Sequence, residues 1–505
     1  MQIEPPAGAF ATTYARGAAQ VVWTTLVADL ETPVSAFLKT GADKPLSFLL
    51  ESVEGGAVRG RYSIIGLDPD VVWRARGDKA EINRAARQDK DAFHPCREPP
   101  LAALRAFINE SRFLLPDSLP PMAAGVFGYL SYDMVRLMEE LPSPNPDPIG
   151  IPDAILVRPT VVIIFDSVLD TLMLVTPVRP AKGVTAEAAL ARAVDRLTAV
   201  VDALDRPLAK EAAGSPAEGL KIAPASNTTA AEFRAMVARA KEYIVAGDIF
   251  QVVLAQRFET PFTLPPFALY RALRRVNPAP FLFYLDYGGF AVAGSSPEIL
   301  VRTRGDKVTI RPIAGTKPRG LTPHEDKALE EELLADPKER AEHLMLLDLG
   351  RNDVGRVAAI GTVTVTDQFF IERYSQVMHI VSNVEGKLDP RHDALDALAA
   401  GFPAGTVSGA PKVRAMEIID ELEKEKRGLY AGCVGYFSAA GEMDSCIVLR
   451  TALVKDGKMY VQAGAGIVAD SNPDSEQQEC INKAKALFRA AEEARRFAGG
   501  AGKGQ

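Results

Sequence analysis

The sequence predicts an α+β fold built on large antiparallel β-sheets. Strand-like runs and helix-like runs come in blocks along the chain and do not alternate strictly, and this order favours α+β over a doubly wound parallel fold. The 505 residues are 47% hydrophobic and 24% charged, which is typical of a globular protein with a buried core. Length alone allows about three domains, or two larger ones.

The first part of the chain is predicted to consist mainly of strands. Alternating or β-rich apolar runs predict strands at 46–50, 160–165 and 172–176, and a helix is expected at 184–204. A stretch rich in Ala, Pro, Gly and Ser at about 205–228 predicts the main linker. We therefore expect an N-terminal part at 1–225, a second part at 229–498 and a flexible tail at 499–505.

The second part opens with a clear helix signal. Thr229 and Glu232 fit a capping box, an apolar stripe follows from Phe233 to Ile244, and Gly247 is a typical helix stop. Further strands are expected at 249–256, 281–286, 290–294, 298–303, 307–311, 361–366, 433–438, 446–454 and 458–463, and further helices at 324–335, 338–347, 411–422 and 475–497.

The charge and cysteine content exclude several classes of protein. The net charge is −7 without a basic block, so nucleic acid is not an expected partner. No apolar run approaches the ~18 residues of a membrane span, and the N-terminus lacks the basic start and apolar stretch of a signal peptide. The 4 cysteines form no C-x-x-C pair, so we expect reduced thiols and a cytoplasmic protein.

Two acidic pairs at helical spacing are candidates for a metal site. Glu339 and Glu342 share one helix face, and Glu476 and Glu479 share a face of the last long helix. If the two faces meet, two bare carboxylates about 4 Å apart repel by roughly 4 kcal/mol, and a divalent cation removes that cost. No Cys or His lies at ligand spacing, so oxygen ligands and Mg²⁺ are expected. Two solvated helix faces are the alternative.

Two further patterns suggest chemistry but lack a necessary part. Residues 464–469 (GAGIVA) match G-x-G-x-x-A, yet a turn follows them and the helix begins too late to hold a pyrophosphate. Their backbone N–H groups are candidates to bind a carboxylate, with a plain tight turn as the alternative. Cys433 lies in GCVG, but no histidine follows His392 to serve as its base, so we expect a buried apolar residue.

Four long runs resemble the chorismate-utilising enzymes in order and spacing. They are 312–320 (PIAGTKPRG), 339–353 (ERAEHLMLLDLGRND), 402–412 (FPAGTVSGAPK) and 464–471 (GAGIVADS). Upstream, 49–52 (LLES), 61–63 (RYS) and 128–133 (GYLSYD) resemble the N-terminal part of anthranilate synthase component I, a branch of that family. The resemblance covers nearly the whole chain and implies a two-layer sandwich of antiparallel sheets flanked by helices.

The resemblance implies a Mg²⁺-dependent reaction of chorismate, the first committed step of L-tryptophan biosynthesis. Ammonia adds at C2 while the C4 hydroxyl leaves, and pyruvate is then eliminated to give anthranilate. Metal charge stabilises the substrate anion. The resemblance places Mg²⁺ on Glu342 and Glu479, with Glu476 and Glu339 closing an acidic ring.

The resemblance also implies the other site residues. Arg450 binds the side-chain carboxylate of the substrate, His379 moves a proton in the elimination, and Thr406 lies in the substrate pocket. Further substrate contacts are implied for Gly315, Thr316, Tyr430, Gly464, Ala465, Gly466 and Lys483. Without the resemblance, a satisfied core histidine is the better interpretation of His379.

Two positions separate the branches of the family. Relatives that add water carry a lysine base where Gln251 stands here, and free ammonia needs no such base. Aminodeoxychorismate synthases carry a nucleophilic lysine where Ala314 stands here. Both residues favour anthranilate formation. The alternatives are an enzyme that stops at the aminated intermediate and a tryptophan-binding regulator without catalysis.

The resemblance implies two partners besides chorismate. A separate glutamine amidotransferase subunit supplies ammonia, so a hetero-oligomer is expected. L-Tryptophan is expected to inhibit by binding between two segments, whose contact residues are Glu51, Ser52, Pro280, Phe281 and Leu282. The second segment is 277–282 (NPAPFL), where the family usually has NPSPYM, so two hydroxyls are lost while apolar volume is kept.

Overall fold

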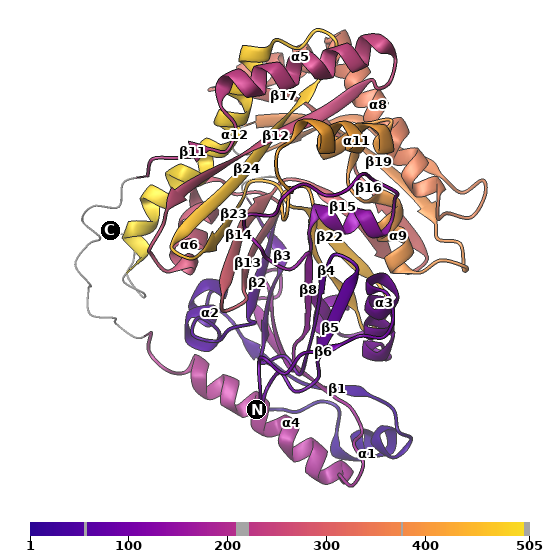
Figure 1. The fold of residues 1–505 in the computed structure, drawn as a ribbon. Helices are drawn as coiled ribbons and strands as arrows, with labels where there is room; N and C mark the ends of the chain where they lie inside the picture. The colour runs from indigo at the N-terminus through magenta and orange to yellow at the C-terminus, as the bar shows by residue number, and fades with distance from the viewer. Residues whose placement is uncertain (55–57, 209–221, 375–376, 499–505) are drawn as a thin grey trace.

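Two antiparallel sheets of 12 strands each form the centre of the molecule (Figure 1). The computed structural model describes residues 1–54, 58–208, 222–374 and 377–498. Between the sheets lies an apolar core to which both contribute; for example, the rings of Phe48 and Phe127 have centroids 4.8 Å apart across it. The predicted α+β class with large antiparallel sheets is confirmed.

The first sheet places strands from the beginning, middle and end of the chain side by side. Its order is β1 (Gln20–Val27), β10 (Thr171–Val178), β9 (Val161–Asp166), β3 (Val58–Leu67), β2 (Phe48–Glu54), β13 (Phe281–Asp286), β14 (Phe290–Ser296), β23 (Thr451–Lys455), β24 (Lys458–Ile467), β12 (Gln251–Pro261) and β11 (Ala225–Ser226), with β20 (Gly409–Ala410) also on β12.

The second sheet is assembled in the same way. Its order is β17 (Ile313–Pro318), β19 (Val377–Lys387), β16 (Lys307–Ile310), β15 (Ile299–Arg304), β22 (Met443–Ile447), β21 (Cys433–Ser438), β7 (Gly125–Leu130), β8 (Ala154–Arg158), β4 (Val71–Arg76), β5 (Lys79–Asn83) and β6 (His94–Pro95), with β18 (Thr364–Arg373) also on β19.

Helices cover the outer faces of both sheets. Those packed on the first sheet are α1 (Ala7–Ala15), α2 (Pro33–Thr40), α4 (Ala186–Leu204), α5 (Ala230–Ala246), α6 (Pro266–Val276), α11 (Lys412–Leu422) and α12 (Pro473–Glu493). Those on the second are α3 (Pro100–Ser111), α7 (Pro323–Ala335), α8 (Pro337–Gly355) and α9 (Ala394–Gly401), while the short α10 (Gly405–Ser408) lies between α8 and α11.

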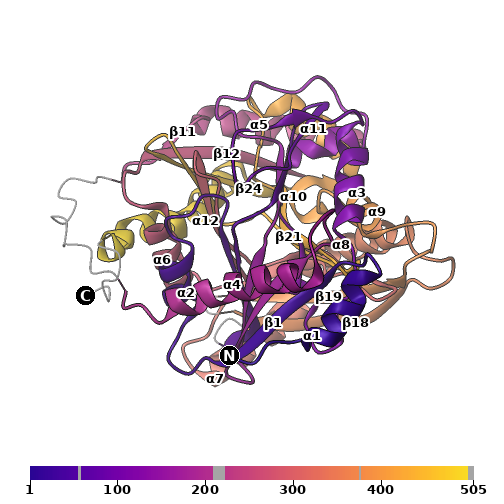
Figure 2. The same ribbon diagram turned by 90° about the horizontal axis from the view of Figure 1, so that it is seen from below.

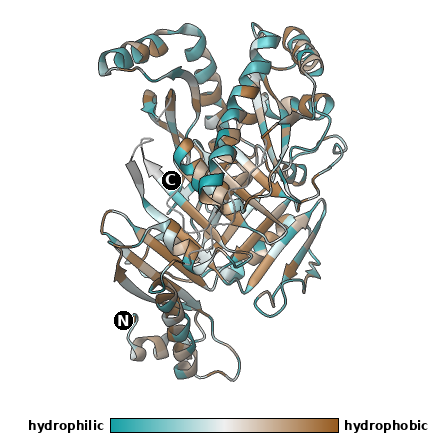
Figure 3. Cartoon of the chain, turned by 90° about the vertical axis from the view of Figure 1, so that its left-hand side faces the viewer, coloured by the Kyte–Doolittle hydropathy of each residue, from teal (hydrophilic) through white to brown (hydrophobic). Residues whose placement is uncertain are grey.

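The views in Figures 2 and 3 show how the helices meet the sheets. Seen from below, α4 lies across the strand layer near β1 (Figure 2), and it packs on β10 and β1. The central strands carry many of the apolar residues, whereas the outer helices show more hydrophilic ones (Figure 3). In the described part of the chain, no helix combines the length and the apolar character that a membrane crossing requires.

Both sheets contain strands from either side of the predicted linker. Leu50 of β2 pairs with Phe283 of β13 in the first sheet, and Val126 of β7 pairs with Phe437 of β21 in the second. The predicted parts 1–225 and 229–498 therefore share both sheets. Residues 209–221 of the linker and the predicted tail at 499–505 lie outside the described residues.

One predicted strand, 446–454, is wrong. The chain leaves the second sheet after Ile447 and enters the first sheet at Thr451, so the run forms the end of β22 and then β23. Arg450 lies in this crossing with φ +47°. Because apolar residues occupy both strands, the sequence gives no signal of the change of sheet.

The predicted helix after Thr229 is confirmed in detail. The Thr229 hydroxyl accepts the N–H of Glu232, whose carboxylate accepts the N–H of Thr229. Gly247 ends the helix with φ +85°. Elsewhere α8 continues to residue 355, past its predicted end at 347, and β18 begins at 364 and so overlaps only half of the strand predicted at 361–366.

Candidate active site

Two glycines of β24 form one wall of the candidate active site. Gly464 and Gly466 lie in the regular ladder between β24 and β12, so this run is neither a tight turn nor a nucleotide-binding turn. A Cβ at Gly464 would come within 2.7 Å of the Tyr430 hydroxyl, and one at Gly466 within 2.5 Å of Gln251 Nε2. Both side chains lie directly over the strand, where glycine leaves them room.

The same stretch of β24 presents backbone groups beside the site. The ladder between β24 and β23 stops at Val461, and Lys483 of α12 donates to the carbonyl of Gly464 at 2.9 Å. Ala465 is fully buried in the core formed with α5 and α11, so only its backbone belongs to the site. Beyond Val461 the β24 backbone no longer pairs with β23, so backbone groups at 464–466 are available on that side. Binding of a carboxylate there stays a prediction.

Gln251 joins β12 to the acidic face of α8. Its Nε2 donates to Glu342 Oε1 at 3.2 Å, while its Oε1 is buried without a donor in the described structure. Burial raises the pKa of Glu342, and the charges of Glu339 and Glu479 raise it further. The carboxylates of α8 and α12 are therefore close enough for their charges to interact, which the spacing within each helix left open.

The acidic residues of α12 have partners in their own helix and in the turn before it. Glu479 forms an ion pair with Lys483 at 2.7 Å. Burial raises the pKa of Glu476; a hydrogen bond from Ser471 opposes the rise and the charge of Glu479 adds to it. Asn472 caps this helix by accepting the N–H groups of residues 474 and 475, which fixes the start of α12 just before Glu476.

These carboxylates suit Mg²⁺ only in part. Among residues 1–54, 58–208, 222–374 and 377–498, no group of three or more His, Cys, Asp or Glu side chains is arranged to hold a metal. Mg²⁺ in enzymes is usually bound by one or two carboxylates together with substrate oxygens and water. Glu342 and Glu479, whose charges interact, fit that smaller requirement.

Glu339 is tied to the Gly315–Thr316 corner of β17. The backbone N–H of Thr316 donates to its carboxylate, which opposes the effect of burial in raising the pKa of Glu339. Gly315 has φ +69°, and a Cβ there would lie 3.1 Å from Glu339 Oε2. A glycine is therefore required both for the backbone angle and for the approach of the carboxylate.

His379 on β19 is a neutral base. Burial lowers its pKa to about 4. Its Nδ1 lies 3.0 Å from the carbonyl of Gly315 and 3.0 Å from the hydroxyl of Thr316. Because a carbonyl only accepts, Nδ1 carries the proton, and Nε2 is left with a free lone pair. The fold places this base beside the same corner that holds Glu339.

Arg450 is a half-buried cation near Glu298. Burial lowers its pKa, and the nearby Tyr374 and Glu298 act in the opposite direction. Among the described residues, the Glu298 carboxylate acts on Arg450 through its charge and forms no hydrogen bond with it. Removing a charge from water without a bound counter-ion is costly, so an anionic ligand would stabilise this side chain.

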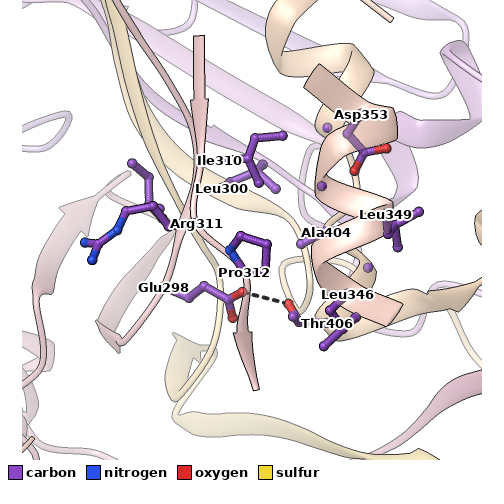
Figure 4. Close-up of a pocket in the computed structure, with 14 residues that line it drawn as sticks. Glu298, Leu300, Ile310, Arg311, Pro312, Leu346, Leu349, Asp353, Ala404 and Thr406 are labelled. Atoms are coloured by element: carbon purple, nitrogen blue, oxygen red, sulfur yellow. Dashed lines mark hydrogen bonds between the residues drawn. The ribbon is translucent and has the colours of Figure 1, made fainter. Parts of the chain in front are cut away.

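Glu298 is a site residue that the sequence did not reveal. Burial raises its pKa to about 8, while a hydrogen bond from the Thr406 hydroxyl, at 3.0 Å, acts in the opposite direction. Glu298 and Thr406 stand at one end of a pocket whose walls include the apolar side chains of Leu346 and Leu349 (Figure 4). The only signal was a single carboxylate amid apolar residues, between β14 and β15.

The two segments predicted to bind tryptophan lie side by side on β2 and β13. Strands β14 and β23 separate them from β24, which carries residues of the candidate active site. Ser52 pairs with Phe281 and Glu51 with Leu282, and Pro280 directly precedes β13. The Glu51 carboxylate is buried, forms an ion pair with Arg274 at 2.8 Å and accepts the Tyr270 hydroxyl. Its hydrogen bonds are thus satisfied within the protein, and ligand contact by these residues stays a prediction.

Cys433 is excluded as a nucleophile. It is 2% exposed on β21, and burial raises its pKa to about 12. A thiol with this pKa carries almost no thiolate at neutral pH.

Comparison with known proteins gives consistent results. A model of the chorismate binding enzymes matches residues 57–489. Anthranilate synthase component 1 of Cereibacter sphaeroides is 58% identical over 97% of this chain and 97% of its own, and that of Thermus thermophilus is 49% identical over 93% and 97%.

Two solved structures have the same fold. Anthranilate synthase component I from Streptococcus pneumoniae superposes with a TM-score of 0.75 at 37% identity, covering 92% of this chain and 99% of its own. MenF, the menaquinone-specific isochorismate synthase from Escherichia coli, gives a TM-score of 0.71 at 21% identity, covering 94% and 95%.

Proposed function

Because the chain belongs to the chorismate binding enzymes, in the branch of the anthranilate synthase component I proteins, we propose that it converts chorismate and ammonia to anthranilate and pyruvate. This is a lyase reaction of L-tryptophan biosynthesis, and we expect it to take place in the cytoplasm. The observation that carries the proposal is that one site holds both Arg450, a cation that can bind an anionic substrate, and the buried Glu298, whose pKa is raised to about 8.

The residues support an amination at C2 with loss of the C4 hydroxyl. Gln251 Oε1 lacks a donor and can accept an N–H of ammonia, which needs no general base because its lone pair is free. Glu298, protonated below about pH 8, donates its proton to the departing hydroxyl, which leaves as water. Arg450 holds the side-chain carboxylate of the substrate through a forked pair of hydrogen bonds.

The second step removes the enolpyruvyl group. The neutral His379 accepts the C2 proton at Nε2, the bond between the ring carbon and the enolpyruvyl oxygen breaks, and the ring becomes aromatic; the released enolpyruvate takes up one proton at its CH₂ carbon to become pyruvate. The Nδ1–H bond to the Gly315 carbonyl fixes the tautomer for this task. Substrate carboxylates bound nearby would raise the pKa of His379 and make it a stronger base.

We assign a Mg²⁺ site to Glu342 and Glu479, with Glu476 close by. When bound there, the ion would stabilise the negative charge of the ring carboxylate. The protein residues supply the positioning: the Gln251 amide orients Glu342, and Lys483 orients Glu479. The open backbone edge of residues 464–466 and the Tyr430 hydroxyl complete the contacts to the substrate.

Ammonia is proposed to come from a separate glutamine amidotransferase subunit, so the working form is a hetero-oligomer. Since Cys433 cannot act as a thiolate, this chain offers no candidate for glutamine hydrolysis at that position. L-Tryptophan is proposed to inhibit by binding at Ser52, Pro280, Phe281 and Leu282, with Glu51 as the structural support of that corner.

The isolated chain with chorismate, Mg²⁺ and ammonium chloride tests the reaction. We expect fluorescent anthranilate and an equal amount of pyruvate. Loss of chorismate without pyruvate would indicate an enzyme that stops at the aminated intermediate. No loss of chorismate would contradict the proposed function.

A further inference from the structure

We propose that Arg427 is a positioning residue that sets the spacing of three segments of the active site. This inference rests on the proposed function, because those segments carry Gln251, Thr406 and Tyr430. Arg427 lies in the loop between α11 and β21 and is 3% exposed. It lies outside the substrate contacts proposed above.

The guanidinium group bridges two segments that are far apart in the sequence. Nη1 donates to the carbonyl of Val407 at 2.7 Å, and Nη2 donates to the carbonyl of Val253 at 2.6 Å. Val407 directly follows Thr406 in α10. Val253 lies two residues after Gln251 on β12, opposite Gly466 of β24. One side chain thus fixes the distance between the Thr406 turn and the Gln251 strand.

Glu423 holds this guanidinium in place. Its Oε2 accepts Nε of Arg427 at 3.0 Å and its Oε1 accepts Nη2 at 2.5 Å, while Oε1 also accepts the N–H of Ala255 on β12 at 2.9 Å. If this ion pair served only to hold its own loop together, Arg427 and Glu423 would need no partners outside that loop. The bonds to Val253, Val407 and Ala255 all go to segments of the site.

Arg427 also supports Tyr430. Its guanidinium carbon lies 5.5 Å from the centroid of the Tyr430 ring and 4.9 Å from that of Tyr132. A cation over an aromatic face is attracted to it, more strongly when both are buried. The Tyr430 hydroxyl lies against Gly464, so a shift of the guanidinium would move this hydroxyl relative to the substrate.

The position requires an arginine. Arginine has five donors in a rigid fork, whereas lysine has one ammonium that cannot reach a carboxylate and two carbonyls in separate directions. Arg427→Lys therefore keeps the charge opposite Glu423 but leaves the carbonyl of Val253 or Val407 without its donor. The charge is conserved and the spacing is lost.

The experiment compares Arg427→Lys with Arg158→Lys. Arg158 is a matched control because it is also buried, with 8% of its surface exposed, and its guanidinium donates to both carboxylate oxygens of Asp70 at 2.8 and 2.9 Å. It lies at the end of β8, among residues that the proposed site does not use. Both variants are studied well below their melting temperatures, with circular dichroism to verify folding. The measurements are hydrogen exchange of segment 402–410 and the kcat and KM for chorismate with ammonium.

For Arg427→Lys we expect exchange at 402–410 to be at least tenfold faster and kcat/KM at least tenfold lower. For Arg158→Lys we expect a comparable loss of melting temperature with both readouts unchanged. Unchanged exchange at 402–410 in Arg427→Lys would overturn the proposal, as would an equal kinetic loss in the control. If Arg427→Lys does not fold, Glu423→Gln, which keeps shape and weakens the clamp, must give the same shifts.

A double-mutant cycle tests the route of the effect. If Arg427 acts through the Thr406 turn, Arg427→Lys and Thr406→Val together will cost less in kcat/KM than the product of the two single losses. Multiplicative losses would overturn this route. The exchange measurement needs no substrate, so it tests the role of Arg427 even if the wild-type chain makes no anthranilate. Absence of anthranilate would count against the proposed function and not against the role of Arg427.

Discussion

At the scale of single residues, burial sets the ionisation of the groups proposed for proton transfer. Glu298 is buried and has a pKa raised to about 8, whereas burial lowers the pKa of His379 to about 4. The acid is thus protonated and the base is neutral at pH 7. The two groups have different hydrogen-bond partners, the Thr406 hydroxyl for Glu298 and the Gly315 carbonyl for His379, so a separate acid and base are available to a two-step reaction.

This assignment predicts a pH dependence. An acid must be protonated and a base neutral to act, so the rate should be constant from well above the His379 pKa of about 4 up to about pH 8, and should fall about tenfold per unit above pH 8, at a fixed concentration of free NH₃. Glu298→Gln should lower kcat by about 10²- to 10⁴-fold and remove this fall. The exposed Glu187→Gln is the control. A retained fall in Glu298→Gln would show that another group titrates.

The metal assignment gives a second prediction. Glu342→Ala or Glu479→Ala should remove the Mg²⁺-dependent activity and leave the melting temperature within a few degrees, because the Glu342 carboxylate repels its neighbours in the free protein. Exposed acids on the same helices, Asp348 and Glu492, provide the controls when changed to alanine. Normal turnover in Glu342→Ala or Glu479→Ala would refute the assignment.

Sequence patterns identified residues whose chemistry depends on spacing. The i, i+3 pairs of acids on α8 and α12 place charges that do interact. They did not identify Glu298, because its role comes from burial, which depends on the packing of β14, β15 and α10 around it. Nor did they identify Arg427, because two of its partners are the backbone carbonyls of Val253 and Val407, which any residue would supply.

At the scale of elements, we predict that activity requires the close approach of the Tyr430 hydroxyl to strand β24. In Gly464→Ala the new methyl group would lie 2.7 Å from the Tyr430 hydroxyl and 2.9 Å from the carbonyl of Leu254. We expect at least a tenfold loss of kcat/KM for chorismate. Gly289→Ala, where nothing lies within 4 Å, is the matched control. Full activity in Gly464→Ala would contradict the position of this tyrosine.

The pairing of β2 with β13 carries the regulatory prediction. Ser52→Phe places a large ring at the junction with Phe281 and should abolish tryptophan inhibition while leaving catalysis in place, because β14 and β23 separate this corner from β24. Calorimetry with tryptophan and the chorismate assay measure the two properties separately. An unchanged inhibition constant would place the inhibitor elsewhere.

Helix and strand positions could be predicted where local signals are strong. The capping box at Thr229 and the stop at Gly247 fixed α5 at both ends. The run 446–454 could not be divided, because leaving one sheet and entering the other requires only an unusual backbone angle at Arg450. That crossing gives Arg450 its place near Glu298, so the missed feature carries a residue that we propose to bind the substrate.

At the scale of the whole molecule, both sheets are built from both parts of the chain. A ligand at β2 and β13 and a substrate at β24 therefore contact the same first sheet. The sandwich core, in which Phe48 meets Phe127, joins this sheet to the second one. Interleaving of this kind depends on long-range strand pairing, which periodicity along the sequence does not encode.

The central physical claim is that α8 and α12 hold one divalent cation against the substrate at β24. Crystals of Glu298→Gln, soaked with chorismate and Mn²⁺ as an anomalous substitute for Mg²⁺, test it directly. We predict a single strong anomalous peak within about 2.0–2.3 Å of carboxylate oxygens of both Glu342 and Glu479 and of the ring carboxylate. A peak bound to neither glutamate, or chorismate bound away from Arg450, would contradict the account.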